Sequence, residues 1–339
     1  MASINTTAAY QELLSLALEE RSDDVQDLVS NSNILLTTIK EQDNWQPYSG
    51  PYIRERLLYN EQTGGGFYSD YDYLQGSPVE LINDAVYTPK QGYIPIVLSN
   101  REILDNAGAN QMKDVVSVHM KAAEQQLMDI VDTSLHGDGT GYGGKEFTGL
   151  RAAVPTANTT GTYGGISRTN NAIWRTTTRD AHSYFTGYTQ VNSTSILPMY
   201  SQVAVENSRA KEGPNLIIAS QQHYLAFQAA TVAIQRITSE SKYGKLGFTS
   251  LQFNGGGRSI DIVRDGGVGS NMPSDTSYIL DMRNLKFRYH PMRNFKNIFT
   301  KPQMPINQDA IVQYIGIMGE LTMTNPLFQV KLYDSVPAS

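Results

Sequence analysis

The chain has no cysteine among its 339 residues, which excludes disulfides, thiolate metal ligands and cysteine nucleophiles. It also has no run of eighteen apolar residues, so no membrane-spanning helix is predicted. The first residues, MASINTTAAYQELL, lack the basic start and the apolar block of a secretory signal. Stability must therefore come from packing, or from association with other copies.

Positive charge is also scarce, with 27 Lys and Arg against 33 Asp and Glu, a formal net charge of −6. Residues 1–44 hold eight acids and two bases. Subtracting these leaves 25 acids and 25 bases, so all of the net charge lies in the first 44 residues. A nucleic-acid binder would be basic, which this chain is not. The acidic segment is either a solvated helix face or an arm that reaches a basic patch on a neighbouring molecule.

Residues with the spacing of a metal or catalytic site are missing. None of the five histidines has another histidine or an acid at the spacing of a metal site. They are His119, His136, His182, His223 and His290. His182 lies near Asp180 and several serines, but no GxSxG motif accompanies them.

A glycine-rich segment after residue 136 matches two nucleotide-binding motifs in part. Gly139, Gly141 and Gly144 fit GxGxxG, and Lys145 extends the match towards a phosphate loop. Both motifs need a preceding strand, whereas a helical pattern precedes this one, and Glu146 replaces the Ser or Thr that would bind magnesium. The sequence therefore predicts no catalytic, cofactor-binding or metal-binding residue, no cofactor and no enzymatic activity.

The most regular pattern in the chain is one long amphipathic stretch, residues 111–136. Its apolar residues recur at intervals of three and four, which predicts a helix with one buried face. They are Met112, Val115, Val116, Met120, Ala123, Leu127, Ile130, Val131 and Leu135. Such a helix would be roughly 37 Å long, and we interpret it as a spine along which the rest of the subunit is laid.

The segment before this helix has the character of a long excursion. Residues 52–59 and 92–98 are rich in β-formers and are predicted to pair as the two arms of a hairpin. Glycines and the tyrosines at 68, 71 and 73 lie between them. Connections of this length inside a compact domain are usually functional or mobile, and tyrosine is favoured at interfaces. The alternative is a small satellite core under the loop.

After residue 171 the pattern becomes mixed. Helices are predicted at 197–209 and 221–237, and short strands at 215–219, 251–253, 259–263, 277–280 and 285–289. Two further strands, 311–321 and 327–332, flank Asn325-Pro326 and are interpreted as one final unit. These elements indicate a compact domain of sheet and two helices.

Several short motifs resemble those of a known protein family. They are Phe147-Thr148-Gly149-Leu150, Gly164-Gly165-Ile166-Ser167-Arg168, Trp174-Arg175, the strand region 251–280 and the ending GELTMTNPLFQVKL. In these motifs and in the order of its segments, nearly the whole chain resembles a major capsid protein of tailed bacteriophages.

The resemblance implies an α+β fold, the tailed-phage major capsid fold, and names for its parts. Residues 1–46 would form an N-terminal arm and 47–98 an extended β-hairpin loop. Residues 99–150 and 305–334 would form a peripheral domain with the spine helix, and 151–304 an axial α/β domain. The arm's contacts would lie mainly between subunits, so removing residues 1–44 is expected to leave a folded body.

The implied function is a structural subunit that assembles as hexamers and pentamers into an icosahedral shell around double-stranded DNA. The implied partners are copies of itself and scaffolding, portal and decoration proteins, with no membrane and no specific DNA binding. The implied location is the virion capsid, assembled in the cytoplasm of the host bacterium. Some relatives begin with a cleaved scaffolding segment. This chain has only a short arm, so a separate scaffolding protein, or removal of such a segment, is expected.

Two alternatives of other classes remain. One is an enzyme or ligand-binding protein with a long mobile loop, because active sites can be assembled from distant residues. The other is a different phage structural protein, such as a tail-tube or decoration protein. The long predicted helix disfavours the second alternative, since those proteins are mostly β.

Some capsid relatives join neighbouring subunits by a lysine–asparagine isopeptide bond. Lys90 is the only lysine in residues 47–98, and Asn294 and Asn325 are two of several possible partners. The reaction also needs a desolvated lysine and a nearby carboxylate base. No pattern selects those groups, so we expect Lys90 to form an ion pair with an acid across an interface and expect no crosslink.

Overall fold

The computed structural model describes residues 34–58, 67–72, 82–101, 109–209, 212–231, 250–255, 257–265, 271–299, 301–304 and 309–336. The helices are α2 (Ile34–Glu41), α4 (Ala109–His136), α5 (Gly141–Gly144), α6 (Leu150–Ala153), α7 (Ile196–Glu206) and α8 (Gln221–Thr231), with 3-10 turns η1 (Ala172–Trp174) and η3 (Met282–Asn284). The strands are β1 (Trp45–Pro47), β2 (Ile53–Leu58), β3 (Ile82–Tyr87), β4 (Lys90–Ser99), β5 (Thr162–Tyr163), β6 (Ile166–Ser167), β7 (Thr177–Asp180), β8 (Leu216–Ala219), β9 (Ser250–Gly255), β10 (Arg258–Arg264), β11 (Thr276–Leu280), β12 (Leu285–Asn297), β13 (Ala310–Met323) and β14 (Val330–Tyr333).

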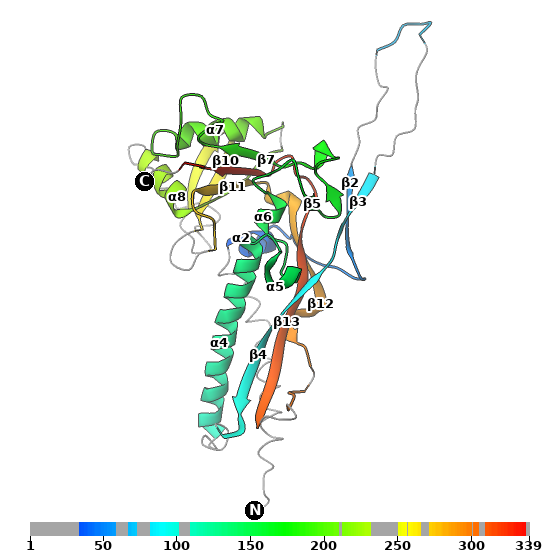
Figure 1. Ribbon diagram of the computed structural model, residues 1–339, viewed down its shortest axis with the longest axis vertical. Coiled ribbons are helices and arrows are strands. Elements are labelled where there is room, and N and C mark those ends of the chain that lie inside the picture. The colour runs from blue at the N-terminus through cyan, green and yellow to red at the C-terminus, as the bar shows by residue number, and fades with distance from the viewer. Residues whose placement is uncertain are drawn as a thin grey trace, which may run out of the picture.

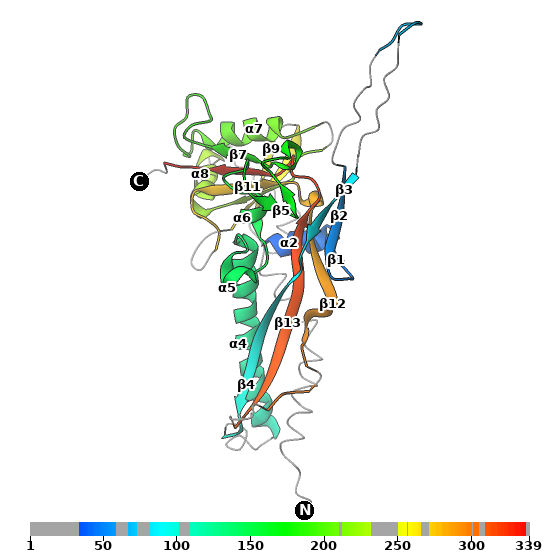
Figure 2. The same cartoon turned by 45° about the vertical axis from the view of Figure 1, so that its right-hand side comes forward.

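The molecule is elongated, with two sheets stacked along its long axis (Figures 1 and 2). In the lower half, α4 runs beside the long strands β4 and β13. The upper half holds a second sheet with α7 above it, and the β2–β3 hairpin projects away from the body.

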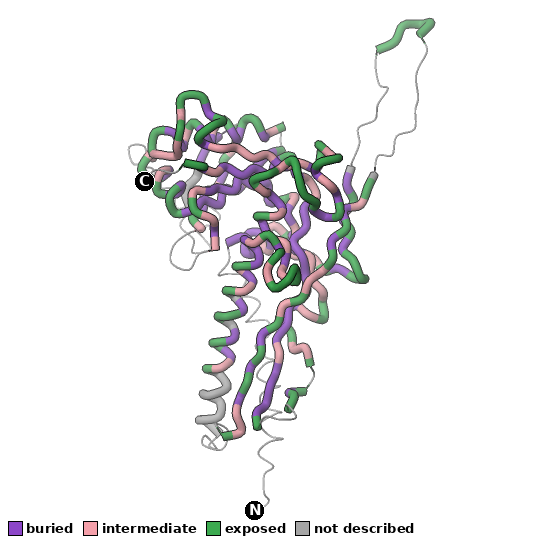
Figure 3. The backbone as a smooth tube through the Cα atoms, in the orientation of Figure 1, coloured by how far each residue is buried: buried purple, intermediate pink, exposed green. Residues whose placement is uncertain are grey.

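The lower sheet has the strand order β1-β12-β13-β4, and α4 packs against β4. Along β4 the side chains alternate, with Ile94, Ile96 and Leu98 buried between exposed residues, as expected for a strand covered on one face. The buried residues of α4 follow the predicted stripe, and Figure 3 shows this face turned inward. They are Met120, Ala123, Leu127, Val131 and Leu135. The predicted spine helix at 111–136 is therefore confirmed.

The upper sheet has the order β7-β14-β11-β8-β10-β9. Its central strand β8 is buried along its whole length, as the apolar run NLIIA predicts. The side chains of Ile217 and Ala219 belong to the core cluster that contains α7 and α8, whereas Leu216 and Ile218 belong to the cluster that includes the α4 residues. The predicted helix at 197–209 is confirmed as α7. The predicted helix at 221–237 is confirmed as α8 up to Thr231, and its remainder lies outside the described residues.

One predicted strand pairing and one predicted structural unit are wrong. β2 pairs with β3, from Ile53 opposite Tyr87 to Leu58 opposite Ile82, and does not pair with residues 92–98. Those residues lie in β4, which pairs antiparallel with β13 over ten residues. Only Thr88 and Pro89 lie between β3 and β4, so the local pattern does not show that the chain leaves one sheet there and enters another. The two final strands also do not form one unit, since β13 belongs to the lower sheet and β14 to the upper one.

The chain changes sheets at places that differ from the predicted domain division. β12, within the predicted axial segment 151–304, belongs to the lower sheet with β13 and β4. β14, within the predicted peripheral segment 305–334, belongs to the upper sheet. β4, within the predicted extended loop 47–98, is likewise part of the lower sheet. Strand pairing decides these memberships, and for β4 the partner strand β13 lies more than 200 residues away, where no local pattern indicates it.

The last part of the predicted N-terminal arm belongs to the core. In α2 the side chains of Leu35, Leu36 and Ile39 are fully buried, and Trp45 in β1 stacks on Phe287 with ring centroids 4.7 Å apart. The expectation that residues 1–44 can be removed without unfolding the body is therefore wrong for residues 34–44. The rest of the predicted arm, residues 1–33, lies outside the described residues.

Candidate functional site

The β2–β3 hairpin is the part of the chain that most clearly offers a surface to another molecule. At its tip, Phe67 and Tyr71 have relative exposures of 110% and 101%, and Tyr68 is 68% exposed. Figure 3 shows this tip far from the rest of the subunit. Large aromatic side chains held away from their own subunit are typical of protein interfaces, where they bury area at low entropic cost.

The root of this hairpin is fixed by an ion pair between a buried carboxylate and a partly buried guanidinium. The Arg288 guanidinium in β12 donates to both carboxylate oxygens of Glu55 in β2, at 2.6 and 3.2 Å. The hydroxyl of Thr322 in β13 donates to the same carboxylate at 3.1 Å, and Arg288 also donates to Gln46 in β1 at 2.7 Å. The pair thus joins four strands, and loss of the Arg288 side chain would leave the buried Glu55 carboxylate without its charged partner.

A second set of contacts holds the other strand of the root. The backbone N–H of Val86 donates to the carbonyl of Gly164 at 2.9 Å, and the rings of Tyr87 and Tyr163 meet edge to face at 5.3 Å. The hydroxyls of these tyrosines donate to backbone carbonyls of β13, at Met323 and Leu321. The hairpin is therefore anchored rigidly at its base.

These contacts explain the motif at residues 164–175. Gly164 has φ +57°, and a Cβ there would lie 2.8 Å from the ring of Tyr87, so glycine is required. Arg168 donates to the carbonyls of Ala152 and Ala153 at the end of α6, and the indole N–H of Trp174 donates to the carbonyl of Tyr163. The motif holds β5 and β6 against the root of the hairpin.

The motif at residues 147–150 has a similar packing role at the end of α4. A Cβ at Gly149 would collide with the carbonyl oxygen of Leu135, so a side chain there would force the loop away from the helix. Phe147 is buried and meets Phe287 of β12 edge to face at 5.8 Å. The motif therefore fixes the exit of the long helix against the lower sheet.

A buried carboxylate lies where β4, β13 and the loop after α4 meet. Glu320 is 1% exposed and accepts the backbone N–H of Thr148 at 2.6 Å. Burial raises the pKa of Glu320 to about 7, although that hydrogen bond and the charge of Lys90 oppose the rise. Lys90 donates to the carbonyl of Gly139 at 3.4 Å and to the hydroxyl of Thr148 at 3.2 Å. These contacts lie within one chain, whereas the sequence predicted an ion pair across an interface.

We expect wild-type particles, boiled and run on a denaturing gel, to give a single band at monomer mass. The Lys90 ammonium is already held by two oxygens of its own chain, and the side-chain oxygen of Asn325 accepts the backbone N–H of Leu327. A ladder of multimers that persists in the exposed-lysine control Lys145→Ala but disappears in Lys90→Ala would contradict this prediction.

A charged joint connects the end of α4 to the upper sheet. Nε2 of His136 lies 2.8 Å from the Asp265 carboxylate after β10, and Nδ1 lies 3.0 Å from the carbonyl of Asp132. Burial alone would lower the pKa of His136, but the carboxylates of Asp265 and Asp132 outweigh it and raise the pKa to about 9. At neutral pH this imidazolium therefore forms an ion pair that ties the two halves of the subunit together.

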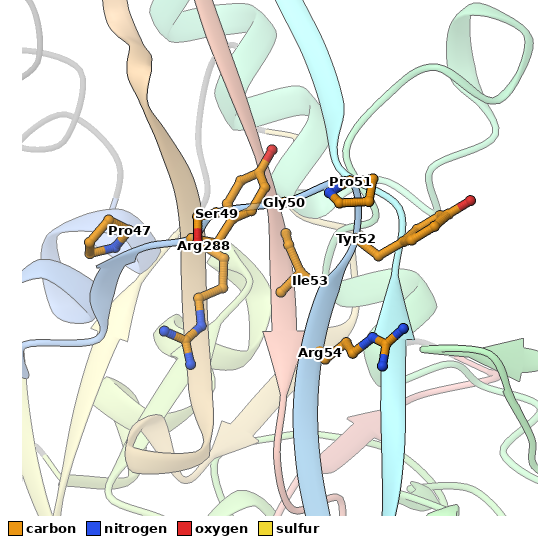
Figure 4. Close-up of a pocket in the computed structure, with 9 residues that line it drawn as sticks. Pro47, Ser49, Gly50, Pro51, Tyr52, Ile53, Arg54 and Arg288 are labelled. Atoms are coloured by element: carbon orange, nitrogen blue, oxygen red, sulfur yellow. The ribbon is translucent and has the colours of Figure 1, made fainter.

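A pocket of about 470 Å³ lies beside the hairpin root, formed by the connection between β1 and β2 together with Arg288 (Figure 4). Its lining contains no histidine and no carboxylate, and Tyr52 and Arg54 point away from Arg288. The Arg288 guanidinium is engaged by Glu55. The lining thus offers no set of converging polar groups of the kind that binds a substrate.

The residues considered as sequence candidates do not come together. The glycines at 139, 141 and 144 lie in and around α5, a single irregular turn. His223 is buried against the Ser277 hydroxyl, 2.7 Å away, whereas His182 is exposed and lies near the carbonyl of Thr189. In the described ranges, no three His, Asp or Glu side chains are grouped as metal ligands, and no helix is long and apolar enough to cross a membrane.

The residues that fix the hairpin root were missed at the level of sequence. Glu55 could have been found, because in IRERLL it shares the parity of Ile53 and Leu57 and so points to the buried side. Its partner Arg288 lies 233 residues away, and Glu320 lies in an apolar strand with no local signal.

Comparison with solved structures identifies the fold. The chain is similar to the cyanophage A-1(L) capsid, with 15% sequence identity, coverage of 88% of this chain and 92% of that one, and a TM-score of 0.62. It is similar to the capsid of the native GTA particle, with 9% identity, coverage of 88% and 91%, and a TM-score of 0.54. A chain of Mycobacterium phage Ogopogo matches at 10% identity, coverage of 89% and 92%, and a TM-score of 0.51.

These matches span nearly the whole of both chains, so the chain has the fold of phage capsid proteins, and the predicted tailed-phage capsid fold is confirmed. No protein-family model matches the chain. No curated protein matches its sequence either. The similarity is one of three-dimensional structure.

Proposed function

We propose that the chain is a shell-forming subunit, many copies of which assemble as hexamers and pentamers into an icosahedral capsid around double-stranded DNA. The observation that carries this proposal is the near-complete structural match to capsid subunits. The projecting hairpin with its exposed aromatic tip supports it, because such an extension adds interface area that a compact subunit lacks.

The outer face of the lower sheet offers an apolar surface for such contacts. The rings of Tyr93 and Phe299 each lie 5.8 Å from the ring of Tyr314, edge to face, and form an aromatic strip across β4, β13 and the segment after β12. Tyr93 and Phe299 are 61% and 43% exposed. We propose that hairpin tips and aromatic strips of neighbouring copies take part in the contacts between subunits.

The further partners and the location belong to the same proposal. Scaffolding, portal and decoration proteins would join the shell, which would be located in the virion after assembly in the host cytoplasm. The net charge of −6 suits a protein that encloses DNA without binding it specifically, because binding the phosphate backbone needs many Lys and Arg.

Removing the tip aromatics tests the proposal. The double variant Phe67→Ser/Tyr71→Ser should leave the melting temperature of the unassembled subunit unchanged, since both side chains are fully exposed. Its yield of particles should fall at least tenfold, because aromatic anchors contribute about 2 kcal/mol or more each at an interface. Dynamic light scattering and sedimentation measure that yield.

The matched control is Tyr142→Ser, which removes a 79% exposed aromatic ring from α5 on the body. It should assemble like the wild type. Equal particle yields from the tip variant and the wild type would show that the hairpin tip does not contribute to the contacts between subunits. A wild-type chain that remains a monomer at all concentrations would overturn the proposed function itself.

A further inference from the structure

Residues 282–304, here called the basic segment, contain six Lys and Arg, one histidine and no acid. They are Arg283, Lys286, Arg288, His290, Arg293, Lys296 and Lys301. The segment comprises all of η3, all of β12 and the residues after β12 up to residue 304. A stretch with a formal charge of +6 is unexpected in a chain whose net charge is −6.

Most of this charge has no counter-charge within the subunit. Arg283 pairs with Asp281, and Arg288 pairs with Glu55. Arg293 donates to the neutral amide of Gln91. Within the described residues, Lys286, Lys296 and Lys301 form no ion pair, and the side chains of Lys296 and Lys301 are exposed.

The basic segment lies at an edge of the lower sheet where another molecule could contact it. β12 lies on the side of the lower sheet away from α4 (Figures 1 and 2). β1 covers only residues 287–289 of β12, so among the described strands residues 290–297 form an outer edge. Lysines and bulges on such an edge also discourage unwanted strand pairing, and β12 has register shifts between Tyr289 and Lys296. Edge protection alone does not explain a complementary charge elsewhere in the same chain.

That complement lies at the start of the chain. Residues 1–33 hold six acids and one base, a formal charge of −5. The described structure begins at Ile34 in α2, and α2 packs against β12. An extended segment of 33 residues spans up to roughly 110 Å, which is more than twice the length of α4, about 42 Å. It is therefore long enough to reach beyond its own subunit.

We propose that the acidic segment, residues 1–33, of one copy docks on the basic segment, residues 282–304, of a neighbouring copy. This inference rests on the proposed function, because it requires copies to lie side by side. Two unlike surfaces on one chain form a heterologous contact, and repetition of such a contact around an axis closes a ring. Opposite charges at the rim of such a contact speed association and determine which two surfaces meet.

The test exchanges the charges. In the strand variant, Lys296→Glu/Lys301→Glu, the exposed lysines are reversed. In the arm variant, Glu20→Lys/Asp23→Lys, two acids of residues 1–33 are reversed. Each variant alone should assemble at least tenfold more slowly than the wild type at 0.05 M salt. The difference should shrink at 0.5 M salt, where exposed charges are screened over a few ångströms. A control that reverses two exposed lysines elsewhere, Lys121→Glu/Lys145→Glu, should assemble at the wild-type rate.

Mixing the two variants decides where the contact lies. An equimolar mixture should regain assembly. The new lysines of the arm variant can pair with the new glutamates of the strand variant, and the native acids of the strand variant's arm can pair with the native lysines of the arm variant's strand. Rescue only when both reversals are placed in one chain would assign the contact to a single subunit and overturn the proposal. Assembly of the strand variant at the wild-type rate would also overturn it. Circular dichroism and melting of the unassembled subunits exclude misfolding, and a wild type that forms no particles would contradict the proposed function instead.

Discussion

Replacing Leu127 with Asp is expected to abolish folding of the subunit. Leu127 is 1% exposed and lies in the middle of the buried stripe of α4, where it belongs to the large core cluster. The substitution removes a buried leucine and places a carboxylate in an apolar site with no partner, at a combined cost of more than about 4 kcal/mol. That cost is comparable with the total stability of many domains, about 5–15 kcal/mol.

The control is Gln126→Asp, one residue earlier on the exposed face of the same helix. This variant should remain soluble and melt within a few degrees of the wild type. Thermal unfolding followed by circular dichroism makes the comparison. A soluble Leu127→Asp subunit with the melting temperature of the control would show that the phase assigned to the helix is wrong.

Truncation of the chain before Trp45 is the second change expected to unfold the subunit. It removes α2, whose leucines at 35 and 36 and isoleucine at 39 are fully buried. Each such side chain contributes about 1.5–3 kcal/mol through burial. The truncation also removes the amide of Asn44, which donates to the carbonyl of Met282 at 2.8 Å. The product is expected to be insoluble, or to unfold without a cooperative transition.

Truncation before Ile34 is the matched experiment, because it removes the acidic segment and keeps every described residue. That subunit should retain cooperative unfolding near the wild-type melting temperature but assemble poorly. If both truncated chains unfold with the same cooperative transition as the wild type, α2 contributes little to the core, contrary to its burial.

The sequence predicted those parts of the fold whose signal is local. The spacing of apolar residues located α4, because a helix buried on one face must repeat that face every three to four residues. The apolar run at 215–219 located β8 for a similar reason, since a strand covered on both faces has no polar side. The short motifs at 147–150 and 164–175 carried the resemblance to capsid proteins, and both serve close packing that admits only particular side chains.

Strand partners could not be predicted from the sequence. The pairings of β4 with β13 and of β12 with β13 decide which sheet each strand joins, and they depend on contacts between residues distant in the chain. The predicted arm ended too late for a related reason. Residues 1–44 were assigned to the arm because of their acidic composition, although they include the apolar segment ILLTTI of α2. The burial of that segment depends on its packing against β12.

Cryo-electron microscopy of the purified full-length protein tests the central claim most directly. The expected result is a closed icosahedral shell in which the β2–β3 hairpin of each copy contacts a neighbouring copy through Phe67 and Tyr71. Monomers or small discrete oligomers at every protein and salt concentration, with the hairpin tip free of contacts, would contradict the claim that this chain is a shell subunit.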